Sequence, residues 1–284
     1  MYRPIWEAVQ KVHGKGDCAW KLMRAAGLND WKDVTRARLE EMVDMGIEAG
    51  LARSSIALYL QIVKQACRRY GEEPEIKIPI SDEALQAVSV PKGGRVLKAY
   101  LRPDEIKTLV RCCHPHGEFQ EAVLNIWVVG ARTGMRTSDI LAVNVANIEG
   151  CKLAYTSIKT GVPAVVPVMP KTAERIAWLQ EHAATVKTLS RQEMCKTIKA
   201  LCRRAGLTRH VTVYGADVTK QGQLWQFVTM HTARISFCTN LARKGVPLAD
   251  IAKMAGHTAT SMTLRYIVPD APVLTDEQLN YFND

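Results

Sequence analysis

Apolar side chains in the first ninety residues recur at three- and four-residue spacing, which is typical of amphipathic helices. The clearest run lies over 54–71, where we expect Ser54 to cap the helix and a glycine to end it. Shorter helices are predicted over 17–26, capped by Asp17, and over about 35–50. This part of the chain is therefore predicted to be a helical domain. The apolar face of its third helix consists of Ile56, Tyr59, Leu60, Val63, Cys67 and Tyr70.

The opposite face of the helix over 54–71 is polar and basic, with Gln61, Lys64, Arg68 and Arg69. Such a face can lie against a duplex, where lysine and arginine contact phosphates and fix the position of the protein. An ordinary solvated face explains the same residues equally well. The helix alone leaves both interpretations open.

The composition changes over 72–98, where charged residues mix with prolines and the chain then enters the basic stretch VPKGGRVLKAY. Stretches of this kind separate domains. We place the boundary within 88–98 and predict a helical domain over 1–90, a basic linker over 91–98 and a second domain over 99–284. The cationic side chains of the linker are expected to follow a phosphate backbone; they are Lys92, Arg95 and Lys98.

The second domain is predicted to be mostly helical with one small β-sheet. A helix opens at Pro103, and a strongly apolar helix covers 118–133. Two β-rich runs flank Lys159-Thr160-Gly161 and predict a hairpin with glycine in its turn. The pattern is helical again from Lys171 but is interrupted by a polar stretch at 208–224, to which we assign no function. The fold class predicted for the whole chain is mainly α with a small β-sheet.

Composition and charge narrow the class of partner. The hydrophobic fraction of 47% is sufficient for packed cores, and 284 residues are enough for two domains. The net charge of +10 favours a polyanionic partner such as nucleic acid, because neutralising phosphates releases counterions. Many basic proteins bind no nucleic acid, so charge alone does not decide the matter.

The sequence predicts a protein of a reducing compartment, most simply the cytoplasm. It shows no apolar core of a signal peptide and no stretch near the roughly 18 apolar residues of a membrane span. Its eight cysteines form no CxxC pair. The cluster over 112–116, Cys-Cys-His-Pro-His, is better explained by a helix that ends at Pro115 than by a zinc site, because its ligands are crowded together without a second half. We predict no metal.

Two short patterns contain cationic residues that can act on a phosphate. Over 133–139, a glycine precedes Arg136 at a helix start, and Asp139 on the same face can hold the guanidinium in place. Lys159 lies at the tip of the predicted hairpin and can act as a mobile proton donor. Taken singly, a surface arginine and a lysine that serves solubility are the simpler explanations.

Three further patterns lie near the end of the chain. His231 and Arg234 are three residues apart at the start of a helix, so they share a face; a histidine moves protons near neutral pH and an arginine binds phosphate oxygens. His257 follows a glycine, and Tyr266 lies nine residues beyond it. Each pattern is common by chance, and a lone tyrosine is usually a packing residue.

The order of the five patterns is more specific than any one of them. From about Leu101 to Val268 the chain resembles the catalytic domain of the tyrosine recombinase family, whose marks are TGxR, a hairpin lysine, HxxR, GH and a tyrosine nine residues after that histidine. The runs TGMRTSDIL and HTARISFCTNLARKGVPLADIAKMAGHTATSMTLRY are similar to integrases of phages and conjugative elements. Residues 1–90 resemble the family's helical core-binding domain only in general character.

The resemblance implies a reaction and a role for each residue. Tyr266 would attack the scissile phosphate of one DNA strand and form a 3′-phosphotyrosine bond, with no ATP, no metal and no other cofactor. Arg136 and Arg234 would clamp the phosphate, and Lys159 would protonate the leaving 5′-oxygen. His257 would donate a hydrogen bond to the phosphate, and His231 would act as acid or base.

The resemblance also implies an assembly. Two domains would form a C-shaped clamp on double-stranded attachment sites, and four protomers would exchange strands through a Holliday junction. Accessory DNA-bending proteins are possible partners. The tail APVLTDEQLNYFND would dock on a neighbouring protomer, and an amino-terminal arm-binding domain is expected to be absent. Two alternatives remain: an enzyme like a type IB topoisomerase or a resolvase, and a helical DNA-binding protein without catalysis.

Overall fold

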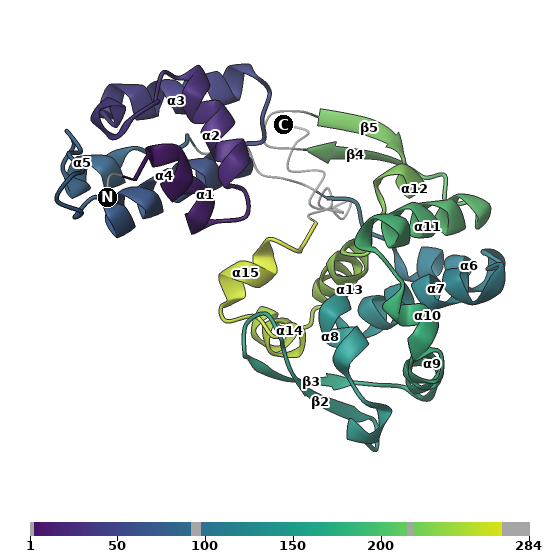
Figure 1. Cartoon of the computed structure of the whole chain (residues 1–284). Coiled ribbons are helices and arrows are strands. Elements are labelled where there is room, and N and C mark those ends of the chain that lie inside the picture. The colour runs from purple at the N-terminus through teal and green to yellow at the C-terminus, as the bar shows by residue number, and fades with distance from the viewer. Residues whose placement is uncertain (1–2, 92–97, 215–218, 269–284) are drawn as a thin grey trace, which may run out of the picture. The chain divides into compact units, whose positions relative to one another are not determined.

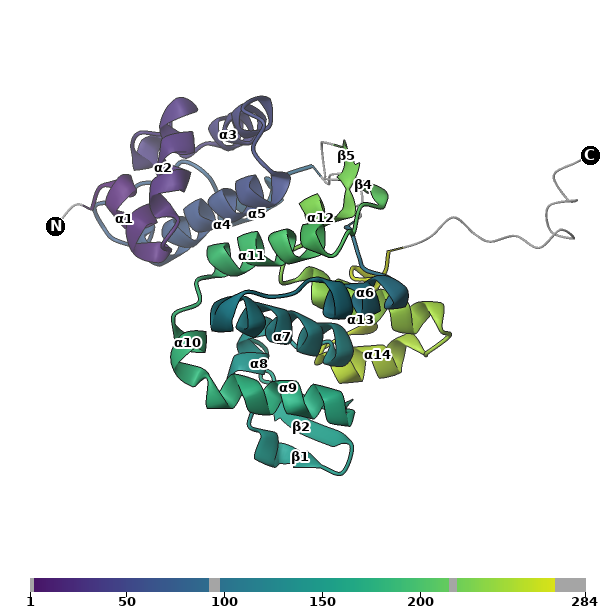
Figure 2. The ribbon, with the colours of Figure 1, turned by 90° about the vertical axis from the view of Figure 1, so that its right-hand side faces the viewer.

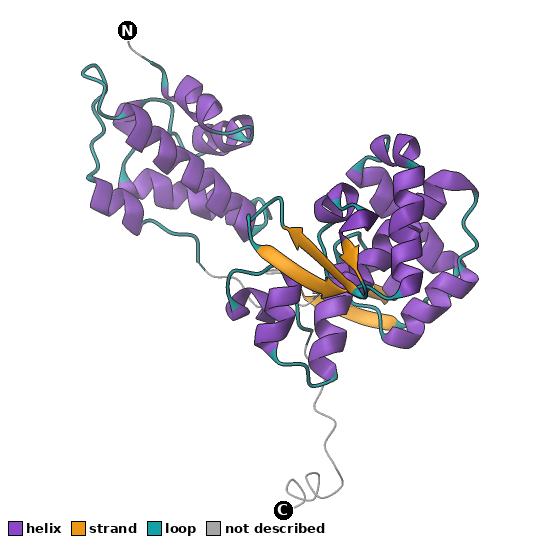
Figure 3. Cartoon of the chain, turned by 90° about the horizontal axis from the view of Figure 1, so that it is seen from below, coloured by secondary structure: helices purple, strands orange, loops and turns teal. Residues whose placement is uncertain are grey.

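The structure is a computed structural model that describes residues 3–91, 98–214 and 219–268. These residues form two compact units (Figure 1). The first consists of residues 3–91, and the second of the described residues from 98 onward. Each unit has its own hydrophobic core. Both units are mainly helical, and the small antiparallel sheets of the described residues belong to the second unit (Figure 3). This arrangement confirms the predicted fold class.

The first unit is a bundle around one long helix, α4 (Arg53–Tyr70). The side of α4 predicted to be apolar is buried at Ile56, Leu60, Val63 and Cys67. Burying such a stripe against neighbouring helices is the main source of stability for helices of this length. The other elements of this unit are α1 (Ile5–Val12), α2 (Gly16–Ala25), η1 (Trp31–Asp33), α3 (Arg36–Glu48) and α5 (Asp82–Ala87).

Two of the predicted helix caps are wrong. Helix α2 begins at Gly16, and the Asp17 carboxylate accepts a hydrogen bond of 2.6 Å from the Gln10 side chain instead of capping the helix. Helix α4 begins one residue before Ser54, with Ala52 at the cap position. Thr35 does cap α3, because its hydroxyl accepts from the Arg38 N–H. The helices themselves lie where they were predicted, and only their first residues differ.

The prediction that Lys64 lies on an exposed basic face is wrong. Its side chain is only 7% exposed, and its ammonium donates to the carbonyl oxygens of Gln86 at 3.1 Å and Val88 at 2.7 Å. These carbonyls close the C-terminal end of α5, where a cation is favourable. Burial lowers the pKa of Lys64. The lysine stabilises the fold of this unit and is not available to a phosphate.

The other predicted DNA contacts of this unit differ in their surroundings. Arg68 and Arg69 are exposed on α4. The Arg68 guanidinium lies 3.4 Å from an Asp82 carboxylate oxygen, and Arg69 lies over the Tyr70 ring. Lys92 and Arg95 lie outside the described residues.

The second unit is built around α7 (Gly117–Thr133), whose residues from Ala122 to Ala131 are all buried. A helix that is apolar on all sides must be covered on all sides. Figure 2 shows α7 among its neighbours, of which α13 is packed most extensively against it. The covering helices are α6 (Pro103–Cys112), α8 (Thr137–Ala142), α9 (Pro170–Glu181), α10 (Ala183–Lys187), α11 (Arg191–Arg204) and α13 (Thr232–Arg243). Three short helices complete the unit: α12 (Leu224–Phe227), α14 (Leu248–Ala255) and α15 (Thr260–Leu264).

The predicted hairpin is present and belongs to a three-stranded antiparallel sheet in the order β1-β2-β3. Strand β2 (Lys152–Thr156) pairs with β3 (Pro163–Pro167), so that Thr156 is opposite Pro163 and the turn falls around Lys159. The short 3-10 helix η2 (Val145–Asn147) and strand β1 (Ile148–Glu149) precede it. The turn is therefore presented at one end of the sheet.

The polar stretch at 208–224 contains a second antiparallel hairpin that the sequence pattern did not predict. It consists of β4 (His210–Tyr214) and β5 (Thr219–Gln223). Neither strand buries a full face, so the alternation of apolar and polar residues that marks a half-buried strand is weak. Among the described residues, no helix is long and apolar enough to cross a membrane.

We predict that Lys64→Ala destabilises the first unit. The substitution leaves two carbonyls at the end of α5 without their buried donor, and losses of this kind cost about 1–3 kcal/mol. Hydrogen exchange measured by mass spectrometry should show faster exchange in α5 and α4. Arg68→Ala, which removes an exposed cation from the same helix, should leave that exchange nearly unchanged. Equal effects of the two substitutions would contradict the buried role of Lys64.

Candidate active site

The loop between α7 and α8 requires glycine at position 134. Gly134 has φ of +71°, a conformation that residues with a side chain rarely adopt. A Cβ atom built there would lie 2.4 Å from the Phe237 ring. The tight turn ends α7 and brings Arg136 to the cap position of α8, one residue before the predicted first turn. The glycine of the TGxR pattern thus sets the position of its arginine.

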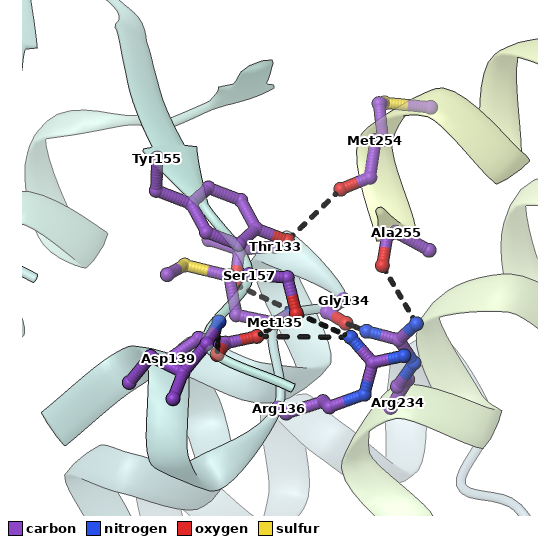
Figure 4. A network of polar contacts seen from close by, with 11 residues as sticks. Thr133, Gly134, Met135, Arg136, Asp139, Tyr155, Ser157, Arg234, Met254 and Ala255 are labelled. Atoms are coloured by element: carbon purple, nitrogen blue, oxygen red, sulfur yellow. Dashed lines mark hydrogen bonds and ion pairs between the residues drawn. The ribbon is translucent and has the colours of Figure 1, made fainter. Parts of the chain in front are cut away.

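The Arg136 side chain is held in a polar network that joins α8 to the β2–β3 turn (Figure 4). Its Nη1 donates to the Ser157 hydroxyl at 2.7 Å and lies 3.8 Å from the Asp139 carboxylate. Asp139 accepts from the Ser157 hydroxyl at 3.1 Å and from the Ile158 N–H at 3.0 Å. The predicted pairing of Arg136 with Asp139 is present, but Ser157 stands between them. The sequence pattern did not assign this role to Ser157.

Arg234 is among the largest fully buried side chains of the described residues, with 1% of its surface exposed. Its Nη1 donates to the Gly134 carbonyl at 2.7 Å, and its Nη2 donates to the Ala255 carbonyl at 2.6 Å (Figure 4). Both carbonyls lie at helix C-terminal ends, where the partial charge is negative. Burial lowers the pKa of Arg234, yet an arginine stays protonated at neutral pH. Its Nε is buried without a hydrogen-bond partner in the described part of the chain.

His257 follows the left-handed Gly256 that ends α14. Its Nδ1 lies 2.9 Å from the Thr263 hydroxyl, whereas its Nε2 is buried and has no partner among the described residues. Burial, with Arg234 and Arg136 nearby, lowers the pKa of His257 to about 4. The histidine is therefore neutral at pH 7 and carries one unused ring nitrogen.

Tyr266 lies close to three of the other predicted residues. Its ring centroid is 4.9 Å from that of His257, 5.2 Å from that of His231 and 5.3 Å from the guanidinium carbon of Arg234. The Thr239 hydroxyl on α13 donates to the Tyr266 carbonyl at 3.0 Å, which fixes the backbone of the tyrosine to the helix that carries Arg234. Three predicted residues, His231, Arg234 and His257, thus lie around the Tyr266 ring.

His231 is partly buried at the start of α13. Burial is the largest cause that lowers its pKa to about 4, and Lys98 and Arg234 add to it. His231 is therefore neutral at pH 7 and able to accept a proton.

Lys98 also belongs to this neighbourhood, although the sequence indicated only a linker cation. Its ammonium lies 5.9 Å from the centroid of the Tyr266 ring. The backbone just after it is anchored to α13, because the Leu101 N–H donates to Ser236 at 2.9 Å and Asn240 donates to the Leu101 carbonyl at 3.0 Å. The folded position of this segment, rather than any motif, places Lys98 beside the tyrosine.

Lys159 differs from the other five predicted residues. It is exposed on the β2–β3 turn, and no hydrogen bond or ion pair links it to another described residue. The turn itself is ordered: the Gly161 N–H donates to the Ser157 carbonyl at 2.8 Å, and Gly161 has φ of +65°. The structure thus fixes the base of the turn and leaves the lysine side chain extended from it.

The assembled site fits an anion. Two arginines lie next to each other, and a lysine is close by. The Arg234 Nε and the His257 Nε2 are buried and have no hydrogen-bond partner among the residues that the structure describes. Two neutral histidines lie beside the Tyr266 ring. Within the described ranges, no cluster of three or more His, Cys, Asp or Glu side chains has the arrangement of a metal site. A cluster of guanidinium groups, neutral imidazoles and a phenol has the chemical groups that phosphoryl transfer requires.

Known proteins resemble both the sequence and the fold. The model of the phage integrase family matches residues 99–271. Tyrosine recombinase XerC of Syntrophus aciditrophicus is 24% identical over 197 residues; the match covers 67% of this chain and 63% of that protein, which is less than two thirds of its length. Tyrosine recombinase XerC of Actinobacillus succinogenes is 23% identical over 261 residues, 90% of this chain and 84% of that protein.

Two solved structures share the fold at low sequence identity. A lambda integrase (75–356) dimer bound to a COC′ core site has a TM-score of 0.62 and 17% identity, and covers 92% of this chain and 89% of the lambda chain. The Tn1549 transposon integrase in complex with a circular intermediate DNA has a TM-score of 0.61 and 14% identity, with 99% of both chains covered.

We predict that His231 and His257 remain neutral down to about pH 5. Burial and the neighbouring arginines disfavour the charged imidazolium, and both pKa values are near 4. Because these folded-state values are below the unfolded value of about 6.5, protonation destabilises the fold as pH falls from about 6.5 to 4. NMR of ¹³C-labelled histidine, with His231→Gln and His257→Gln for assignment, measures both titrations. A midpoint near 6.5 for either ring would contradict the buried site.

We predict that Gly134→Ala destabilises the second unit more than Gly161→Ala does. Both glycines have positive φ, so each alanine costs about 1–2 kcal/mol of backbone strain. Only the Cβ at position 134 also meets the Phe237 ring, whereas no atom of the described residues lies within 4 Å of a Cβ at position 161. Urea unfolding followed by tryptophan fluorescence compares the two variants. An equal decrease in the free energy of unfolding for the two variants would show that packing does not constrain the turn at 134.

Proposed function

The chain belongs to the phage integrase family and is a tyrosine recombinase, and on this basis we propose that Tyr266 breaks and rejoins one strand of duplex DNA. The observation that carries the proposal is the position of the Tyr266 ring against His231, His257 and the buried Arg234. A tyrosine in ordinary packing has no need of a buried cation and two neutral imidazoles around it.

Cleavage is a transesterification in which atoms and protons balance. The Tyr266 oxygen forms a bond to phosphorus on the 3′ side, and the bond from phosphorus to the 5′-oxygen breaks. His231 accepts the phenol proton, for which its neutral state is suited. The phosphodiester is kept as a covalent bond to the protein, so attack by a free 5′-hydroxyl can rejoin the strand without ATP.

The transition state gathers negative charge on the non-bridging oxygens of the phosphate. Arg136 and Arg234 stabilise this charge, and each preorganised donor of this type contributes roughly 10²–10³ in rate. Arg234 already uses Nη1 and Nη2 on helix carbonyls and therefore offers its Nε. His257 donates from Nε2 when its Nδ1 accepts from the Thr263 hydroxyl. The two carbonyls and Thr263 thus orient the groups that bind the phosphate.

Lys159 protonates the 5′-oxygen as it leaves. An alkoxide is a poor leaving group, and general-acid catalysis of this step is typically worth about 10²–10⁴. The lysine extends from a turn that is attached to Arg136 through Ser157, so its ammonium can reach a bound phosphate from the hairpin side.

The proposed biological reaction is site-specific recombination in the cytoplasm of a bacterial or phage-infected cell. A relative of the same fold, lambda integrase, is known as a tetramer bound to a Holliday junction. We propose that this chain likewise acts as a homotetramer on two attachment sites, with its two units forming a C-shaped clamp and the first acting as a core-binding domain. Arg68 and Arg69 remain proposed DNA contacts. The proposed docking tail over 271–284 lies outside the described residues.

Covalent capture on DNA of randomised sequence tests the proposal, because it needs no defined target site. We expect the full chain, mixed with such duplexes and stopped with SDS, to retain a DNA fraction that protease releases. Repeated rounds should enrich one site. On a nicked duplex of that site, Tyr266→Phe should bind DNA but form no adduct, because it lacks the nucleophilic oxygen. Tyr214→Phe, which alters an exposed tyrosine of β4, should react like the unchanged protein.

The outcomes separate the alternatives. An adduct with Tyr266→Phe would mean that another residue is the nucleophile. DNA binding without any adduct would favour a non-catalytic DNA-binding protein. Relaxation of supercoiled plasmid without exchange between two enriched sites would favour a topoisomerase.

A further inference from the structure

A buried hydroxyl group, that of Ser157, links the base of the β2–β3 turn to Arg136 and Asp139. Ser157 is fully buried, at 0% exposed, whereas Ile158 beside it is 64% exposed. Strand β2 ends just before Ser157. The Ser157 N–H donates to the Val162 carbonyl at 2.9 Å across the turn. The turn therefore points outward from a single buried position at its base.

The Ser157 hydroxyl both donates and accepts a hydrogen bond. It donates its proton to the Asp139 carboxylate at 3.1 Å and accepts from Arg136 Nη1 at 2.7 Å (Figure 4). A serine hydroxyl has one proton, so this division satisfies the donor and one acceptor site. The direct hydrogen-bond partner of Arg136 is thus a residue of the hairpin and not the acid on its own helix.

Asp139 completes a closed set of contacts. Its other carboxylate oxygen accepts from the Ile158 N–H at 3.0 Å, so the acid holds two consecutive residues of the hairpin. Asp139 is itself buried, with 2% of its surface exposed. Buried polar networks of this kind are rigid when all their members are satisfied. Moving the turn therefore moves the partner of the arginine as well.

We propose that Ser157 is a positioning residue that sets the Lys159 turn and the Arg136 guanidinium in register with each other. The inference rests on the proposed function, since it assigns the lysine as proton donor and the arginine as phosphate clamp. With the hydroxyl present, the two groups reach one phosphate together. Without it, the turn keeps only the Ile158 contact, and the lysine loses its alignment with the leaving oxygen.

A change of leaving group distinguishes this role from general damage. In a duplex whose scissile phosphate carries sulfur in place of the bridging 5′-oxygen, the leaving group is a thiolate, which departs without a proton. A defect that acts through Lys159 is therefore relieved on this substrate. A defect in phosphate binding by the arginines, or in the fold, slows cleavage of both substrates.

The test compares cleavage rates of the full chain on oxygen and sulfur duplexes of the site enriched by covalent capture. We expect Ser157→Ala to slow cleavage of the oxygen substrate by about 10–100-fold, as misplacement by about 1 Å does. The loss on the sulfur substrate should be at least about tenfold smaller. Ser157→Cys keeps the size of the side chain but has a weak hydrogen-bonding group, and it should show the same pattern.

Three variants serve as controls. For Lys159→Ala, the sulfur substrate should restore the cleavage rate by the largest factor. For Arg136→Ala, the cleavage rate should fall by the same factor on both substrates. Thr156→Ala removes an exposed hydroxyl from the adjacent position and should cleave both substrates normally. Thermal unfolding of each variant confirms that the chain is folded.

The outcomes that overturn the inference differ from those that overturn the proposed function. Ser157 does not position the lysine if both Ser157 variants cleave the oxygen substrate at the normal rate. The same conclusion follows if their cleavage rates fall by the same factor on the two substrates. If Lys159→Ala shows no relief, the assignment of Lys159 as proton donor fails. If the unchanged protein forms no adduct with Tyr266, the proposed function itself fails.

Discussion

The burial of Arg234 is the interaction on which the site depends. A guanidinium that is almost completely removed from water needs partners for its charge, and the carbonyls of Gly134 and Ala255 provide them. The turn after α7, the end of α14 and the start of α13 are therefore held together by one side chain. The same turns place Arg136 and His257, so the geometry of the proposed phosphate clamps follows from a single buried cation.

The remaining electrostatics follow from that burial. Close positive charges and low solvent exposure keep His231 and His257 neutral, as their pKa values near 4 indicate. In the proposed function, a bound phosphate supplies negative charge to this cationic cluster. The carbonyls at the helix ends and the Asp139 carboxylate offset part of the repulsion between the two arginines. Preorganisation of this kind is what electrostatic catalysis requires.

Much of the site was predictable from sequence because the motifs are local. TGMR and AGH place a glycine where the backbone has positive φ; Arg136 lies two residues after the first glycine and His257 directly after the second. Contacts between distant elements were not predictable. Lys64 has the spacing of an exposed helical face but meets the end of α5, and the pattern within one helix contains no information about that partner. The approach of Lys98 to Tyr266 and the bridging role of Ser157 likewise depend on packing, and the β4–β5 hairpin lacks a buried face that would mark it.

The most direct test of the account is to locate the covalent bond to DNA. The protein–DNA adduct is trapped with SDS, digested with nuclease and trypsin, and the peptide that carries the nucleotide is sequenced by tandem mass spectrometry. Cleavage after Arg265 leaves a C-terminal peptide that contains both Tyr266 and Tyr281, which the fragment ions separate. The account predicts a nucleotide linked through its 3′-phosphate to Tyr266. A nucleotide on Tyr281 or on any other residue, or a link through a 5′-phosphate, would contradict it.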